Sequence, residues 1–177
     1  EEDLKPKTLR GFMIDITERK KVESDKREAE ERYKTLIEHS YDIILETNVN
    51  GTFLYINPTF CDVLGYEQEE LLGRSIFEHI HEDDAAETIE QFSAAINKFD
   101  RGTATYRFSN KSGDWRWLES VASPFRLATG EIRTVISSRD VTERIESEKK
   151  LQSAFNEIEM LKDKLEKENV YLQKELE

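Results

Sequence analysis

One cysteine and three histidines are the side chains in this 177-residue sequence best suited to nucleophilic, redox or metal chemistry. Cys61 has no second cysteine to pair with, so it forms no internal disulfide and no Cys/His cluster of the kind that binds structural zinc. His79 and His81 stand close together in the sequence, and His39 stands far from both. No catalytic Ser, His and Asp motif and no glycine-rich phosphate-binding loop occurs. The sequence therefore predicts no metal site and no enzymatic activity for this chain.

A five-residue motif occurs twice, as Asp15-Ile16-Thr17-Glu18-Arg19 and as Asp140-Val141-Thr142-Glu143-Arg144. Each copy ends an apolar stretch and opens a charged one that favours a helix. The copies are a whole domain apart, farther than the roughly 20–50 residues of a solenoid repeat. We therefore expect a piece of a longer tandem array, with residues 1–19 as the tail of a preceding domain, 20–34 as a connecting helix and 35–144 as one complete domain.

The charge pattern limits the partners of this chain. The net charge is −12 and 36% of residues are charged, concentrated in residues 18–32 and 143–177. An acidic surface of this kind repels phosphates, so we expect no direct nucleic acid binding by these residues. No apolar run is long enough for a signal peptide or a membrane span, and we expect a cytoplasmic location.

The apolar runs between these charged ends predict an α+β domain. Five runs bounded by turn residues are expected to be strands: 41–47, 52–56, 103–109, 115–125 and 132–139. Three helical segments are expected between the second and third strands: 60–64, 67–72 and 85–97. Hairpin connections give an antiparallel sheet with the helices on one face, and an apolar concavity between the two layers.

Several short motifs follow one another along this domain. They are Tyr55-Ile56-Asn57-Pro58-Thr59-Phe60, Leu64-Gly65-Tyr66, Glu70-Leu71-Leu72-Gly73, His81-Glu82-Asp83-Asp84, Gly113-Asp114-Trp115-Arg116-Trp117-Leu118-Glu119 and the second copy of the repeated motif. In this order and spacing, residues 31–144 resemble a PAS sensory domain of the PAC-containing kind. The resemblance implies a five-stranded antiparallel sheet in the order 2-1-5-4-3, flanked by N- and C-terminal helices. It also implies that the preceding domain is a PAS domain.

The resemblance argues against two common cofactors. Flavin-binding members carry their cysteine in an Asn-Cys-Arg-Phe-Leu-Gln segment, whereas Cys61 follows Phe60 on a short helix, where we expect a core or half-buried thiol. Haem-binding members carry a histidine on the long helix, and residues 85–97 contain none. We predict neither haem nor flavin and leave an unidentified small ligand open.

Nine side chains are expected to line a ligand pocket in the concavity. They are Phe53, Tyr55, Phe60, Leu64, Ile76, Phe92, Ile96, Tyr106 and Phe108. Strand alternation places Phe53 with Tyr55, and Tyr106 with Phe108, on shared faces. The alternative is that these side chains close-pack and fill the core without a ligand.

The second copy of the repeated motif is where a signal could leave the domain. Asp140 ends the last strand and can cap the next helix, Thr142 falls in the first turn, and Arg144 can reach back to a carboxylate, with Asp140 the local candidate. The resemblance implies that this Asp-x-Thr element couples the sensor core to an output helix, and we place Trp117 in the same path. The alternative is a well-capped helix start and nothing more.

The final residues, 145–177, predict a parallel coiled coil that makes a homodimer. Its spaced seam residues are Leu151, Phe155, Ile158, Leu165, Asn169, Leu172 and Leu176. The leucine and isoleucine positions recur every seven residues, with an interruption at Lys162. Asn169 takes an a position, where a buried Asn favours a parallel, in-register dimer.

The expected function is a sensory and regulatory PAS module in signal transduction. It would sense a small ligand or a partner and act through the coiled coil on an output domain outside this sequence. Residues 161–176 resemble the linker before the AAA+ ATPase of sigma-54-dependent transcriptional activators, the favoured output. Tandem PAS domains equally resemble the sensor region of a two-component histidine kinase. A ligand-free dimerisation scaffold is the alternative of another class.

Overall fold

The computed structural model describes residues 15–175, and their side chains over residues 15–167. Helix α1 (Thr17–Glu38) forms one unit, and the chain from Ser40 onward forms a second unit that contains the sheet. Among the described residues, no helix combines the length and the apolarity needed to cross a membrane.

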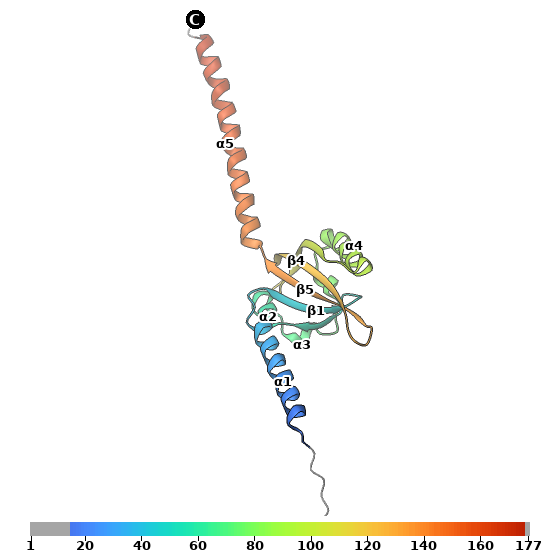
Figure 1. Cartoon of the computed structure of the whole chain (residues 1–177). Coiled ribbons are helices and arrows are strands. Elements are labelled where there is room, and N and C mark those ends of the chain that lie inside the picture. The colour runs from blue at the N-terminus through green and yellow to red at the C-terminus, as the bar shows by residue number, and fades with distance from the viewer. Residues whose placement is uncertain (1–14, 176–177) are drawn as a thin grey trace, which may run out of the picture. The chain divides into compact units, whose positions relative to one another are not determined.

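Five antiparallel strands form one sheet in the order β2-β1-β5-β4-β3, the order that the family resemblance implies (Figure 1). The strands are β1 (Ile43–Asn48), β2 (Phe53–Ile56), β3 (Gly102–Ser109), β4 (Trp115–Arg126) and β5 (Ile132–Asp140). Each lies where the sequence predicts a strand, with small shifts at the ends. The predicted α+β class is therefore confirmed.

The connection from β2 to β3 holds all the helical turns of the core. They are α2 (Pro58–Leu64), α3 (Gln68–Leu71), the 3₁₀ turn η1 (Ile76–His79) and α4 (Glu82–Lys98). Helix α2 has Pro58 at its start, where no N–H is needed, and ends at Gly65 with a φ of 77°. Helix α4 begins before the predicted Ala85, because the His81 side chain accepts a hydrogen bond from the Asp83 N–H and caps the helix there.

The face of α4 that packs on the core includes Phe92 and Ile96, which the helical spacing of the sequence places on one side, but not Ile89. The spacing of Ile89, Phe92 and Ile96 predicts their shared burial, but Ile89 is 40% exposed. The buried residues of α4 are Thr88, Phe92 and Ala95. The polar side chain of Thr88 can be buried because its hydroxyl donates a hydrogen bond to the Asp84 carbonyl at 2.8 Å.

Three aromatic rings fill the core between α2 and the sheet. Phe53 and Phe60 have ring centroids 5.9 Å apart, and so do Phe60 and Phe108, both pairs in edge-to-face geometry. His79 stacks on Phe108 with centroids 5.4 Å apart. This end of the core is closely packed.

Asn57 joins β1 to the start of α2 through its buried side-chain amide. Its Oδ1 accepts hydrogen bonds from the N–H groups of Ile44 at 3.0 Å and Phe60 at 3.2 Å. Its Nδ2 donates to the Asp42 carbonyl at 3.0 Å. One side chain thus satisfies backbone groups of two elements, so it fixes where the helical connection leaves the sheet.

A β-bulge corrects the predicted position of Tyr55. The β1–β2 register shifts between Glu46 and Thr47, so Thr47 pairs with Phe53 while Glu46 pairs with Tyr55. Thr47 and Phe53 are buried, and the Glu46–Tyr55 pair lies on the other face of the sheet. The prediction that Phe53 and Tyr55 share a face was wrong, because simple alternation fails across a bulge.

The two flanking helices begin in the same way. The Thr17 N–H donates to Asp15 Oδ1 at 2.9 Å, and the Thr142 N–H donates to Asp140 Oδ1 at 2.8 Å, where α5 (Thr142–Glu175) begins. Helix α1 takes in the predicted 20–34 segment and continues to Glu38, past the predicted domain start at residue 35. The assignment of residues 1–19 to a preceding domain stays a prediction, and residues 1–14 lie outside the described ones.

We predict that Asn57→Ala lowers the free energy of unfolding by about 1–3 kcal/mol, since the Ile44 N–H would lose its side-chain acceptor away from water and the Asp42 carbonyl would lose a donor, while the Phe60 N–H keeps the Asn57 backbone carbonyl. Urea unfolding followed by circular dichroism measures this value. Asn97→Ala, an exposed change on α4, is the matched control and should stay close to the wild type. Equal effects of the two changes would contradict the role given to Asn57.

Candidate functional site

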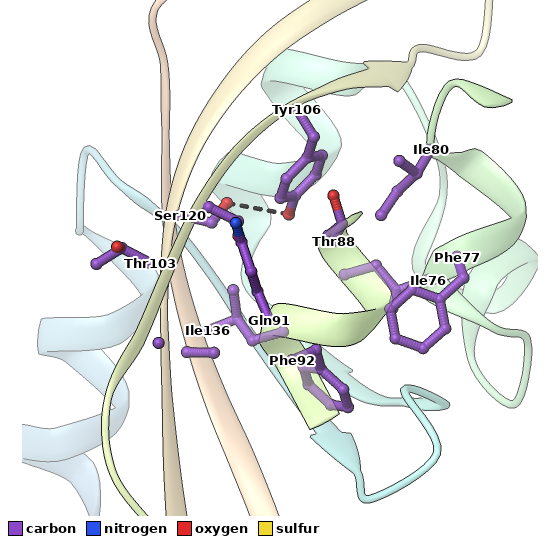
Figure 2. A pocket seen from close by; sticks show the side chains of 13 residues that line it. Ile76, Phe77, Ile80, Thr88, Gln91, Phe92, Thr103, Tyr106, Ser120 and Ile136 are labelled. Carbon is purple, nitrogen blue, oxygen red and sulfur yellow. Dashed lines mark hydrogen bonds between the residues drawn. The ribbon is translucent and has the colours of Figure 1, made fainter. Parts of the chain in front are cut away.

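A cavity of about 30 Å³ lies between α4 and the inner face of the sheet (Figure 2). Its wall is mostly apolar and includes Ile76 of η1, Phe92 of α4 and Ile136 of β5. Gly102 lets β3 approach α4 closely, because a Cβ there would lie 2.9 Å from the Ala95 Cβ. The space is sufficient for water, which needs roughly 10–15 Å³, or for a molecule of very few heavy atoms.

Three buried hydroxyls form a polar cluster at the sheet side of the cavity. Ser120 Oγ donates to Tyr106 Oη at 3.0 Å, a bond drawn in Figure 2, and lies 2.7 Å from Ser138 Oγ. Burial raises the pKa of Tyr106, so its phenol stays neutral. Of the three, Tyr106 and Ser120 line the cavity, so their hydroxyls are the polar groups of the cluster that a bound molecule could reach.

The lining of the cavity favours a neutral ligand. Among the described residues that line it, none carries a charge. An ion would have to leave water without a partner of opposite charge there, which is costly. The cavity can therefore hold a small uncharged molecule that presents a hydrogen-bond acceptor to the hydroxyl cluster.

The structure brings three of the nine predicted pocket residues to this cavity. They are Ile76, Phe92 and Tyr106. The other six do not line it: Phe53, Tyr55, Phe60, Leu64, Ile96 and Phe108. Of these, Phe53, Phe60 and Phe108 form the packed aromatic cluster at the other end of the core.

The prediction missed the small and polar residues of the cavity wall. Thr88 and Gln91 come from α4, and Ala104, Ser120 and Ala122 come from the two strands beside it. A search for large apolar side chains passes over them, although space opens where side chains are small. Inward alternation of Leu118, Ser120 and Ala122 on β4 was the available signal.

His79 places a titratable group in the packed end of the core. Its Nδ1 lies 3.3 Å from the Tyr66 hydroxyl, and its buried Nε2 has no hydrogen-bond partner among the described residues. Burial lowers the pKa of His79, because the imidazolium would be poorly solvated. Cys61 is half-buried, as expected, and burial raises the pKa of its thiol, so the nucleophilic thiolate is disfavoured.

The junction of the sheet with α5 is built from three hydrogen bonds. The Trp117 N–H donates to Thr142 Oγ1 at 2.9 Å, and the Val141 N–H donates to the Trp117 carbonyl at 2.8 Å. The third bond is the Asp140 cap on the Thr142 N–H. Strand β4, the end of β5 and the first turn of α5 are therefore held at one point.

Arg144 does not pair with Asp140, the local candidate. Its guanidinium contacts Glu119 Oε1 on β4 at 3.2 Å, while Asp140 lies 3.8 Å from Arg116. The Asp140 oxygen that faces α5 is already engaged as the helix cap, and the first turn of α5 lies beside β4. The pairing predicted from sequence distance was wrong for this reason.

The predicted seam of α5 is exposed where the structure describes it. Leu151, Phe155, Ile158 and Leu165 are 60–74% exposed. Asn169 and Leu172 lie in α5 beyond the residues whose side chains are described, and Leu176 lies outside the described residues. A row of exposed apolar side chains leaves this face of α5 free to pair with another helix.

Comparison with known proteins finds related sequences and a matching family model. The family model for the PAS fold matches residues 53–139. The two-component sensor PprA of Pseudomonas aeruginosa is 28% identical over 72% of this chain and 14% of its own length. Hypoxia-inducible factor 1-alpha of Gallus gallus is 35% identical over 40% of this chain and 9% of that protein. The chain thus spans a small part of these relatives.

Solved structures with the same fold cover the core. The PAS domain of an HTR-like protein from Haloarcula marismortui is 32% identical, with a TM-score of 0.60 over 68% of this chain and 98% of that one. The PAS-B domain of Drosophila melanogaster Cycle with bound ethylene glycol is 27% identical, with a TM-score of 0.53 over 55% of this chain and 98% of that one.

We predict that His79 makes folding less favourable in acid. Because its pKa is lowered in the folded state, the unfolded chain takes up the proton first, near the ordinary value of 6.5. Stability is then fully present above that pH and is lost as the pH falls towards the lowered folded pKa. Urea unfolding at several pH values should show a steeper acid loss for the wild type than for His79→Gln. Both proteins keep His39 and His81, so parallel curves would contradict the prediction.

Proposed function

This chain belongs to the PAS family of sensory domains, and on that premise we propose that its core senses a small neutral molecule in the cavity beside α4. The observation that carries the proposal is an apolar cavity whose wall includes two hydroxyls, Tyr106 and Ser120, of the Tyr106, Ser120 and Ser138 cluster. A ligand with a hydroxyl group or an acceptor oxygen could hydrogen-bond to these two hydroxyls. The core itself then acts as a binding module, without catalysis.

Output would pass from the sheet to α5 at the Trp117, Asp140 and Thr142 junction. Ser120 and Ser138 lie on β4 and β5, the strands whose residues Trp117 and Asp140 belong to the junction. A ligand that draws the hydroxyls together would change the spacing of these two strands. The hydrogen bonds of Thr142 would transmit that change to the helix.

We propose that α5 pairs with α5 of a second copy in a parallel dimer. The exposed row of Leu151, Phe155, Ile158 and Leu165 supports pairing, and Asn169 favours a parallel register. In a dimer, a structural change at the junction would alter the packing of the two α5 helices. That change in packing could act on a distant output domain.

Two kinds of output domain can be proposed for the whole protein. The likeness to PprA, a two-component sensor, supports a two-component signalling protein. The resemblance of residues 161–176 to the linker of sigma-54-dependent activators supports transcription regulation instead. The segment that follows in the gene separates them: a P-loop ATPase in one case, a histidine-bearing dimerisation helix in the other.

We predict that ethylene glycol binds in the cavity and that acetate, its anionic counterpart of similar size, does not. A titration followed by ¹H–¹⁵N NMR should shift the amides of Tyr106 and Ser120 with ethylene glycol alone. Ala122→Leu fills the cavity and should abolish the shifts, whereas Val121→Leu on the exposed face should preserve them. Absent shifts, or shifts that survive in a folded Ala122→Leu protein, would favour the ligand-free scaffold.

We predict that Ile158→Lys weakens the dimer roughly a hundredfold or more, because an unpaired charge would be buried in the seam. Sedimentation equilibrium measures the dissociation constant. Glu157→Lys changes a neighbouring position off the seam and serves as the control. A monomeric wild type, or equal dimerisation of both variants, would rule out pairing at this position.

A further inference from the structure

We propose that Arg107 and Trp117 link the start of α4 directly to α5, by way of an indole ring shared with Lys149. This route runs through the Trp117 side chain, whereas the Trp117 backbone takes part in the hydrogen bonds of the Asp140 and Thr142 junction. Its use in signalling rests on the proposed function, but the link itself requires neither a ligand nor an output domain.

Arg107 is held at the start of α4 by several charge-assisted bonds. Its backbone N–H and its Nε both donate to Asp84 Oδ2, at 2.9 and 2.8 Å, and a terminal nitrogen donates to Oδ1 at 2.8 Å. The same nitrogen lies 3.1 Å from Asp83 Oδ2. The Arg107 carbonyl accepts from the His81 N–H at 2.9 Å. Bidentate geometry and partial shielding make this contact stronger than an ordinary surface ion pair.

Asp84 is also connected to the cavity wall. The Thr88 hydroxyl donates to the Asp84 carbonyl at 2.8 Å, and Thr88 lines the cavity together with Phe92. Any shift of α4 that accommodates a molecule in the cavity therefore acts on Asp84. The Arg107 clamp would carry that shift to β3.

The indole ring of Trp117 contacts both Arg107 and a residue of α5. It pairs with Arg107 in the β3–β4 register, and the Arg107 guanidinium carbon lies 5.4 Å from its ring centroid. Lys149 Nζ, from α5, lies 5.2 Å from the same centroid. Both distances are within the range of a cation–π contact. One indole ring therefore attracts cations from two elements.

The charges around the Trp117 ring determine whether a change at Asp84 loosens or tightens α5. Two cations can share a ring here because the Arg107 charge is compensated by Asp84 and Asp83. If Asp84 moves away, Arg107 repels Lys149, whose exposed, flexible side chain can leave the ring at low cost. Loss of the clamp should therefore loosen the early turns of α5.

A double-mutant cycle read by amide hydrogen exchange tests this link. Asp84→Asn keeps the side-chain shape and removes its charge, and should speed exchange in the early turns of α5 roughly two- to fivefold, as a cation–π contact of ordinary strength allows. In a Lys149→Met background the acceleration should vanish. In a Lys150→Met background, the matched control next to it, the acceleration should remain. The proposal would be overturned if Asp84→Asn accelerated exchange equally in the Lys149→Met and Lys150→Met backgrounds. It would also be overturned if Asp84→Asn alone did not accelerate exchange.

A reciprocal measurement covers the case in which Asp84→Asn does not fold. Lys149 is exposed, so Lys149→Met should leave the fold intact. Coupling acts equally in both directions, so this change should shift the NMR amide signals of Arg107 and His81, while Lys150→Met should not. Unmoved signals would overturn the link and leave the ligand and dimer proposals standing. An absent ethylene glycol response would overturn the ligand proposal and leave the link standing.

Discussion

The pairing of β5 with both β1 and β4 is the constraint on which the rest of the structure depends. Strand β5 is the last strand along the chain, yet it lies at the centre of the sheet. It pairs with Ile43–Asn48 on one side and with Leu118–Arg126 on the other. The long connection from β2 to β3 must therefore cross one face of the sheet. This crossing forms the helical layer that encloses the cavity. The junction with α5 also follows, because β5 ends beside Trp117 on β4.

The core has two ends with different packing. Edge-to-face rings of Phe53, Phe60 and Phe108 close one end, where large side chains meet. At the other end α4 faces Ala104, Ser120 and Ala122, whose side chains are too small to fill the layer. A protein interior close-packs wherever its side chains can reach one another, so the hollow lies where they are short.

The polar groups of the core and its rim hold elements that are distant in sequence. Asn57 fixes the exit from the sheet into the helical connection, and Thr142 fixes the exit into α5. Arg107 closes the edge of β3 by pairing its backbone with His81 and Asp84. Each contact joins two elements at a point where one of them begins, so a small change in one element alters how the next one starts.

The sequence by itself determined the fold class, the approximate strand ranges and the presence of the helices between the second and third strands, because backbone periodicity and glycine turns act within a few residues. The strand order came from the family resemblance. Only the tertiary structure decided that Tyr55 leaves the inner face, that Thr88 is buried in place of Ile89, and that Arg144 contacts Glu119. A bulge, a helix rotation and an ion pair between distant residues depend on which elements meet in space. Residue spacing alone does not contain that information.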